Sequence, residues 1–88
     1  MIRRVIFEPK AKEEYDYWKK ENIKNVEKIR GLVQNIKKTT FHGLGKPEPL
    51  KYGLSGYWSR RIDKLHRLIY RVTDEAIVVI SCRHHYDE

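Results

Sequence analysis

The apolar residues of this chain change their spacing half-way along it, and this change restricts the possible folds more than any other feature. Before residue 39 they recur every three or four positions, which is the period of one helix face. After residue 49 the chain is rich in Tyr, Trp, Ile and Val, which is typical of strands. Residues 39–49 contain glycines and prolines without any period, which predicts a loop. The chain is therefore expected to fold as helices packed on a sheet.

Two helices are predicted in the first half. A short strand at 2–7 ends just before Pro9, and proline is favoured in the first turn of a helix. The first helix is expected to run from Pro9 to about Glu21. Its apolar face is formed by Ala11, Tyr15 and Trp18. Asn22 is the expected N-cap of the second helix, which continues to about Lys38.

Three strands are predicted in the second half, at 56–62, 65–72 and 76–85, with a tight turn at 73–75. Such a succession of short strands favours an antiparallel meander. A chain of 88 residues is short enough for one domain. We therefore expect a single α+β domain over 1–88, with a short N-terminal strand, two helices and an antiparallel β-sheet meander that carries the helices on one face.

Strand alternation sorts the side chains of this meander into two faces. The expected core face of the strand 65–72 is formed by His66, Leu68, Tyr70 and Val72. Arg67 has the opposite parity, and matching register on the neighbouring strands predicts that Arg61, Arg67 and His85 share the face that the helices leave uncovered. Cys82 falls with Val78 and Ile80 on the core parity. A cationic sheet face that also carries a histidine is a natural site for an anion.

The charge of the chain points in the same direction. Lys and Arg number 19 against 12 Asp and Glu, which gives a formal charge of +7. Such a surplus favours polyanions such as nucleic acid, an anionic membrane or an acidic protein, but it does not select among them. A surplus that serves solubility alone is the other interpretation.

Two further features exclude whole classes of protein. The longest apolar run, 76–80, is far shorter than the roughly 20 residues of a membrane helix. No signal peptide is apparent behind the basic start, so we expect a cytoplasmic protein that has no membrane partner. Cys82 is the only cysteine, which excludes an intrachain disulfide and a cysteine-built metal site.

Several motifs follow one another in a specific order. They are Gly45-Lys46-Pro47-Glu48-Pro49-Leu50-Lys51, Leu54-Ser55-Gly56-Tyr57-Trp58-Ser59-Arg60-Arg61-Ile62, His66-Arg67-Leu68-Ile69-Tyr70 and Cys82-Arg83-His84-His85-Tyr86. Together with Tyr15-Asp16-Tyr17-Trp18 they span nearly the whole chain. In this order they resemble the YoeB toxins of the RelE superfamily.

The resemblance implies the toxin of a bacterial type II toxin–antitoxin pair, with a RelE-like fold. It implies a ribosome-dependent endoribonuclease that cleaves mRNA in the ribosomal A site and is held inactive by a YefM-like antitoxin. Its partners would be the ribosome, mRNA and the antitoxin, with operator DNA bound only through the antitoxin complex and a homodimer as a further possibility. No cofactor is implied.

The resemblance also implies a role for each matching residue. Glu48 would be the general base, His85 the general acid, and Arg67 with Arg61 the clamp on the phosphate. Substrate placement would fall to Lys46, Lys51 and Tyr86. Asp87 and Glu88 extend past the His-Tyr pair, which closes the chain in many family members.

Carboxylate, guanidinium and imidazole are sufficient for RNA cleavage without a metal. A base deprotonates the ribose 2′-OH, cations stabilise the phosphorane-like transition state, and an acid protonates the leaving 5′-oxygen. The products would be a 2′,3′-cyclic phosphate and a 5′-hydroxyl. Glu48 lies between two prolines, which stiffen its loop. Nearby arginines lower the pKa of a carboxylate, so Glu48 either removes the proton or orients the 2′-OH.

Simpler interpretations exist for each residue. Glu48 in isolation reads as a solvated turn residue, and Arg61 and Arg67 as salt-bridge partners of Asp63, Asp74 or Glu75. The His84-His85 pair suggests a metal site, but neighbouring strand residues point to opposite faces, so we reject it. The alternative function is a non-enzymatic toxin or binding module on the same scaffold, such as a ParE-like gyrase inhibitor or an RNA-binding relative.

Overall fold

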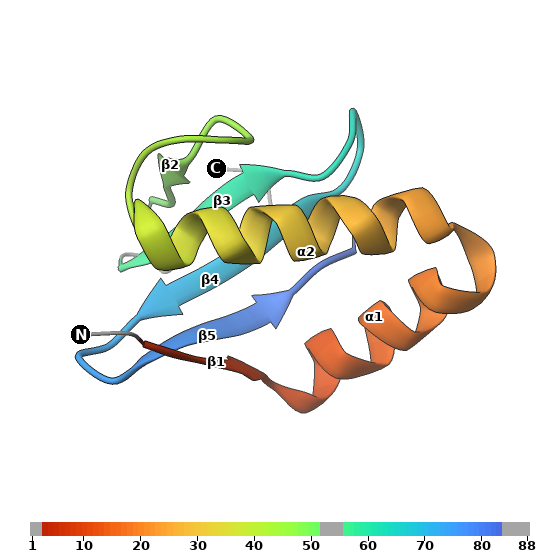
Figure 1. The fold of residues 1–88 in the computed structure, drawn as a ribbon, viewed down its shortest axis with the longest axis horizontal. Coiled ribbons are helices and arrows are strands. Elements are labelled where there is room, and N and C mark those ends of the chain that lie inside the picture. The colour runs from red at the N-terminus through yellow and green to blue at the C-terminus, as the bar shows by residue number, and fades with distance from the viewer. Residues whose placement is uncertain (1–2, 52–55, 84–88) are drawn as a thin grey trace.

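A computed structural model describes residues 3–51 and 56–83, which form two helices and one mixed sheet (Figure 1). In chain order the elements are β1 (Arg4–Phe7), α1 (Pro9–Glu21), α2 (Ile23–Lys38), β2 (Glu48–Pro49), β3 (Tyr57–Arg61), β4 (Arg67–Val72) and β5 (Ala76–Ser81). The strand order across the sheet is β1-β5-β4-β3-β2. Strands β2 to β5 are antiparallel neighbours, whereas β1 runs parallel to β5. The expected α+β meander is confirmed, with a parallel edge strand added to it.

Both helices begin where local signals predict. Pro9 occupies the first turn of α1, and the predicted end at Glu21 is confirmed. The side chain of Asn22 accepts hydrogen bonds from the backbone N–H groups of Lys24 (3.1 Å) and Asn25 (3.4 Å), so the predicted N-cap of α2 is also confirmed. Such a cap satisfies donors that the first helical turn otherwise leaves without partners.

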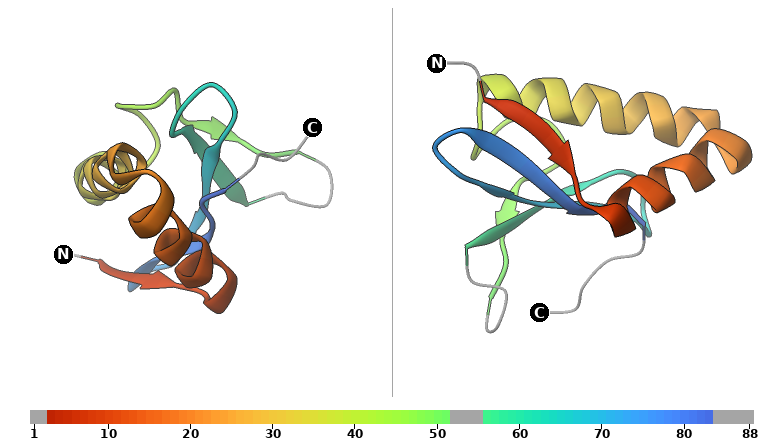
Figure 2. Two further views of the ribbon diagram at one scale, coloured as in Figure 1. Left: turned by 90° about the vertical axis from the view of Figure 1, so that its right-hand side faces the viewer. Right: turned by 90° about the horizontal axis from the view of Figure 1, so that it is seen from below.

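The two helices lie on the same side of the sheet, as the edge-on views in Figure 2 show. Their apolar faces pack on alternate residues of the strands. The buried cluster between the two layers consists of Ala11, Trp18, Val26, Ile29, Leu32, Val33, Ile36, Ile62, Leu68, Tyr70, Ile77, Val79 and Cys82. Leu68 and Tyr70 thus lie on the face predicted for them, and the other face of β3 and β4 points away from the helices.

Within the described residues, no helix combines the length and apolar character needed to cross a membrane.

The predicted parity of β5 is wrong, because the strand contains a bulge. Tyr70 pairs with Val79 but its neighbour Ile69 pairs with Ser81, so Ile80 is an extra residue in the ladder. An extra residue reverses the alternation beyond it. Val79 and Cys82 therefore both reach the helix side, three positions apart. Cys82 is buried as expected, but because of the bulge and not because it shares a face with Val78 and Ile80.

The strand bounds also differ from the prediction: β3 covers 57–61 where 56–62 was expected, and β4 begins at Arg67 where residue 65 was expected. The last strand ends at Ser81, earlier than the predicted residue 85. Glu48, predicted in a loop, belongs to the two-residue edge strand β2, where it pairs with Ser59 while Pro49 pairs with Trp58. Proline has no N–H to donate to a neighbouring strand, so within sheets it is found mainly in edge strands such as β2.

Candidate active site

Pairing of β2 with β3 brings Glu48 onto the sheet face that points away from the helices. Glu48 lies opposite Ser59, and Ser59 in turn lies opposite Ile69 on β4. The Cβ atoms of directly opposed residues are about 5 Å apart. The Glu48 side chain is half-buried. A carboxylate is thus held beside the central strands, whereas a free loop would leave it mobile.

Arg61 and Arg67 occupy the same face. They are direct cross-strand partners, so their side chains lie side by side at one end of the β3–β4 pair. Nη1 of Arg67 donates a hydrogen bond of 3.3 Å to Oγ of Ser59. Ser59 therefore stands between Glu48 and Arg67. The predicted shared face of the two arginines is confirmed, and Glu48 belongs to it as well.

Ser59 is a member of this face that sequence reasoning did not select. Its hydroxyl contacts Arg67, and its backbone position is opposite Glu48. The signal was present in the alternation of Ser59 with Arg61, which places both side chains on one face. The sequence does not contain the strand register that places Glu48 opposite Ser59, so it gives no reason to select this serine.

The positive charges of Arg61 and Arg67 are not neutralised by carboxylates in the part of the chain that the structure describes. Its salt bridges join Asp16 to Lys12 (2.9 Å) and Lys19 (3.5 Å) on α1. The interpretation of the two arginines as salt-bridge partners is therefore wrong for the described residues. Two adjacent guanidinium groups without carboxylate partners suit a phosphate, which binds such groups through paired hydrogen bonds.

Asp63, one of the carboxylates considered for that role, is used in the β3–β4 turn. Its Oδ1 accepts hydrogen bonds from the backbone N–H groups of Leu65 (2.9 Å) and His66 (2.7 Å). Burial acts to raise the pKa of Asp63, but the backbone hydrogen bonds from His66 and Leu65 outweigh it, and the pKa lies below its usual value. Asn25 of α2 donates to the other oxygen at 3.2 Å. Asp63 thus ties the turn to the helix layer.

Lys46 and Lys51 lie on either side of Glu48 along the chain, and both are exposed. Lys46 has a backbone φ of 50°, a left-handed conformation that is uncommon for a residue with a side chain. Lys51 directly follows Leu50, whose N–H donates to the Tyr57 carbonyl at 2.8 Å. Both lysines are therefore near the edge strand that holds Glu48.

His85 and Tyr86 lie outside the described residues, as do His84, Asp87 and Glu88. The chain that leads to them is anchored on α1. Oε1 of Glu14 accepts hydrogen bonds from the Cys82 N–H (2.8 Å) and the Ser81 hydroxyl (3.1 Å). Nε1 of Trp18 donates to the Cys82 carbonyl at 2.8 Å. Sequence reasoning missed Glu14, because a helical glutamate gives no sign of a partner 68 positions away.

Cys82 is an unreactive part of this anchor. Burial, together with the negative charge of Glu14, raises the pKa of its thiol to about 12. Its Sγ lies 3.5 Å from the Ala11 carbonyl oxygen. The thiol is therefore protonated at neutral pH and serves packing.

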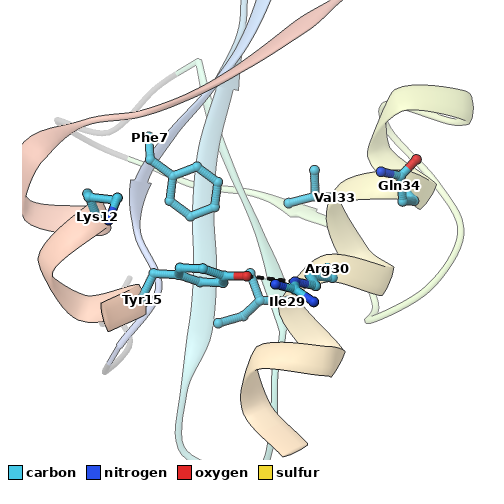
Figure 3. Close-up of a pocket in the computed structure, with 7 residues that line it drawn as sticks. All are labelled: Phe7, Lys12, Tyr15, Ile29, Arg30, Val33 and Gln34. Atoms are coloured by element: carbon cyan, nitrogen blue, oxygen red, sulfur yellow. Dashed lines mark hydrogen bonds between the residues drawn. The ribbon is translucent and has the colours of Figure 1, made fainter. Parts of the chain in front are cut away.

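A cavity of about 840 Å³ lies on the opposite side of the sheet, between β1 and the two helices (Figure 3). Phe7, Tyr15 and Ile29 turn their side chains toward it, and Nε of Arg30 donates to the Tyr15 hydroxyl at 2.8 Å. None of the predicted site residues that the structure describes lines this cavity. The apolar cavity and the polar face are thus separated by the sheet.

Comparison with known proteins places this arrangement in a family. A family model for the YoeB-like toxin of the bacterial type II toxin–antitoxin system matches residues 7–86. The chain belongs to this family of YoeB-like toxins. Toxin YoeB of Escherichia coli K12 is 45% identical over 83 residues, which cover 94% of this chain and 99% of that toxin.

Solved structures of YoeB toxins agree with the fold of this family member. A YoeB dimer from Staphylococcus aureus matches with a TM-score of 0.92 at 42% identity and covers 98% of this chain and 100% of that one. A YoeB–YefM complex from the same organism matches with a TM-score of 0.87 at 44% identity, over the same shares of the two chains. The RelE-like toxin fold expected from the sequence motifs is therefore confirmed.

Proposed function

We propose that this YoeB-family toxin is a ribosome-dependent endoribonuclease that cleaves mRNA in the ribosomal A site without a catalytic metal. The observation that carries the proposal is the grouping of Glu48, Ser59 and Arg67, with Arg61 beside them, on the sheet face away from the helices. One face thus offers a carboxylate and two guanidinium groups without carboxylate partners among the described residues.

The proposed reaction is an internal transesterification of the RNA backbone. Glu48 accepts the proton of the ribose 2′-OH while the 2′-oxygen attacks the neighbouring phosphorus. The bond from phosphorus to the 5′-oxygen breaks, and His85 gives that oxygen a proton. Arg67 and Arg61 stabilise the negative charge that builds up on the phosphoryl oxygens. The products are a 2′,3′-cyclic phosphate and a 5′-hydroxyl.

A formal charge of +7 favours binding of this toxin to the ribosome, which is a large polyanion. Such a toxin acts where translation takes place, in the cytoplasm. A YefM-like antitoxin is the proposed inhibitor, since a relative is seen with YefM, and a second copy of the toxin is a further partner. An acidic antitoxin segment that pairs with Arg61, Arg67 and Lys51 would compete with RNA, so its association rate should fall steeply with added salt.

The direct test is mRNA cleavage in a purified translation system, with the end groups of the products determined. The parent toxin should leave a 2′,3′-cyclic phosphate and a 5′-hydroxyl only when ribosomes are present. His85→Ala should lower the rate by about 10² to 10⁴ while the protein stays folded. Intact mRNA together with inhibited DNA gyrase would instead identify a non-enzymatic gyrase inhibitor.

A further inference from the structure

Among residues 3–51 and 56–83, Arg60 is the one charged residue that is buried. The residue is 0% exposed and lies on the helix side of β3, directly before the exposed Arg61. Its three side-chain nitrogen atoms all donate hydrogen bonds, and the acceptors come from α2, from β4 and from the segment after α2. They are Asn35 Oδ1 (2.6 Å), the carbonyl oxygens of Thr39 (2.6 Å), Thr40 (3.3 Å), His42 (3.1 Å) and Leu44 (3.1 Å), and Tyr70 Oη (3.2 Å).

None of these acceptors carries a full negative charge. The positive charge of Arg60 is balanced by carbonyl and amide oxygens at the C-terminal end of α2, where the helix dipole is negative. Burial of a cation is unfavourable, and a core built only from apolar residues avoids that cost. Stability of the core is therefore not a sufficient reason for a guanidinium at this point. What the guanidinium does is hold several backbone carbonyl groups in one arrangement.

These carbonyl groups belong to the segment that leads from α2 to Glu48. Arg60 contacts the segment as far as Leu44, and the backbone N–H of Arg61 donates to the next carbonyl, that of Gly45, at 2.7 Å. Gly45 has a φ of +81°, and a Cβ at this position would lie 2.8 Å from Leu32 Cδ2. Lys46 continues in the left-handed region with a φ of 50°. The segment that leads to Glu48 is thus tied to β3 by hydrogen bonds to five of its carbonyl groups, those of Thr39, Thr40, His42, Leu44 and Gly45.

Tyr70 extends the same network across the sheet. Its hydroxyl accepts from Nε of Arg60 and donates to the Thr40 carbonyl at 2.8 Å. Burial raises the pKa of the Tyr70 phenol, although the hydrogen bond and the charge of Arg60 act in the opposite direction. The hydroxyl therefore remains protonated and available as a donor at neutral pH.

We propose that Arg60 is a positioning residue for Glu48. The inference rests on the proposed function, because it assigns Arg60 a role in the reaction of Glu48. By fixing the segment 39–44 from inside the protein, Arg60 determines where Glu48 enters β2 and hence its position opposite Ser59 and near Arg67. Arg60 itself faces the helices and does not contact the RNA.

The test variant is Arg60→Lys, which keeps the positive charge. A lysine has one nitrogen with three donors and cannot span acceptors that a planar guanidinium reaches with three nitrogens. Single-turnover cleavage on ribosomes should become about 10²-fold slower, because a displacement of a reacting group by about 1 Å has effects of this size. KM should stay within about threefold, because the cations that bind RNA are on the other face.

A matched control separates positioning from loss of stability. Ile77→Val removes one methylene from the core far along β5 and should lower the urea concentration at the midpoint of unfolding. This variant should cleave at the parental rate. If Ile77→Val loses as much activity as Arg60→Lys at a comparable loss of stability, the effect of Arg60 is merely structural and the proposal is wrong.

A double-mutant cycle with Glu48→Gln decides the route of the effect. If Arg60 acts through Glu48, the variant Arg60→Lys/Glu48→Gln should cleave no more slowly than Glu48→Gln alone, whereas independent effects multiply. Multiplied losses, or a parental rate for Arg60→Lys, would overturn the role of Arg60 while leaving the proposed function in place. Intact mRNA with the parent toxin would overturn the proposed function itself, and the role of Arg60 with it.

Discussion

The two faces of β3 and β4 use arginine in opposite ways. Arg60 is 0% exposed and donates hydrogen bonds through all three side-chain nitrogens, whereas Arg61, the next residue, is exposed and lies opposite Arg67. The first face is covered by two helices, and the second carries Glu48 and Ser59. An arginine therefore binds backbone carbonyl groups on one face, whereas the neighbouring arginine stays exposed on the other.

This contrast shows how a small protein accommodates several cations close together. The donors of Arg60 are hydrogen-bonded to carbonyl oxygens, so this buried cation is accommodated without a carboxylate partner. Arg61 and Arg67 keep their charge in contact with water, where an unpaired guanidinium costs little. A phosphate that replaces this water then meets donors already in place. In the proposed function, the rigid arrangement on one face supports phosphate binding on the other.

The first prediction tests whether the face away from the helices is the reactive one. Arg67→Met should slow single-turnover mRNA cleavage by about 10² to 10³, which is the usual loss for one group that stabilises transition-state charge. The unfolding free energy should change by no more than about 0.5 kcal/mol, because the side chain is only half-buried. A urea titration beside the cleavage assay checks both quantities. Parental cleavage by folded Arg67→Met would remove Arg67 from the reaction.

The second prediction tests the contrast between the neighbouring arginines directly. Arg60→Met should lower the unfolding free energy by about 2 to 3 kcal/mol, because it leaves buried carbonyl groups without donors. The matched variant Arg61→Met should change it by about 0.5 kcal/mol or less. Urea denaturation of both proteins provides the comparison. Equal stability losses would mean that the two faces do not differ as described.

A third prediction concerns the connection between the helix layer and the end of β5. Glu14→Ala should lower the unfolding free energy by about 1.5 kcal/mol, because it removes the charged acceptor of the Cys82 N–H and the Ser81 hydroxyl. Glu14→Gln keeps an oxygen acceptor at the same place and should lose clearly less. If both variants lose the same amount in a urea titration, packing of the side chain matters and the hydrogen bonds do not.

The smallest effect is a pH dependence that comes from the covered face. The pKa of Cys82 is raised from 9.0 to about 12 in the folded protein, so the unfolded chain loses this proton first as pH rises. The contribution of the thiol to stability is complete below pH 9 and is lost progressively toward pH 12. Between pH 9 and 10 the parent should lose about 1 kcal/mol more unfolding free energy than Cys82→Ala does. Parallel pH curves for the two proteins would contradict the raised pKa.

Local signals in the sequence were enough for the helices. Pro9 and Asn22 act within a few residues of their own position, and both helix starts lie where these residues predict. Alternation was also sufficient for β4, where Leu68 and Tyr70 face the helices. It failed in β5, because one extra residue near Ile80 reverses the faces without any local signal.

Strand alternation predicted that Arg61 and Arg67 share one face, whereas Glu48 was selected through the resemblance. Glu48 and Arg67 are separated by a loop and a strand, and their proximity depends on the pairing of β2, β3 and β4. Ser59 and Glu14 were missed for the same reason, since each has its partner on another element. His85 and Tyr86 remain predictions.

Local propensity and composition were sufficient to predict the α+β class, the helix ends and the cationic character of the protein. The difference between Arg60 and Arg61, by contrast, arises from the fold. Two adjacent arginines look alike in a sequence, and strand parity merely says that they point to opposite faces. The position at which α2 ends and the path of the next segment back to the sheet determine which face is covered. They also place the carbonyl groups that accept hydrogen bonds from the buried guanidinium. Such long-range contacts form between residues whose separation along the chain carries no signal.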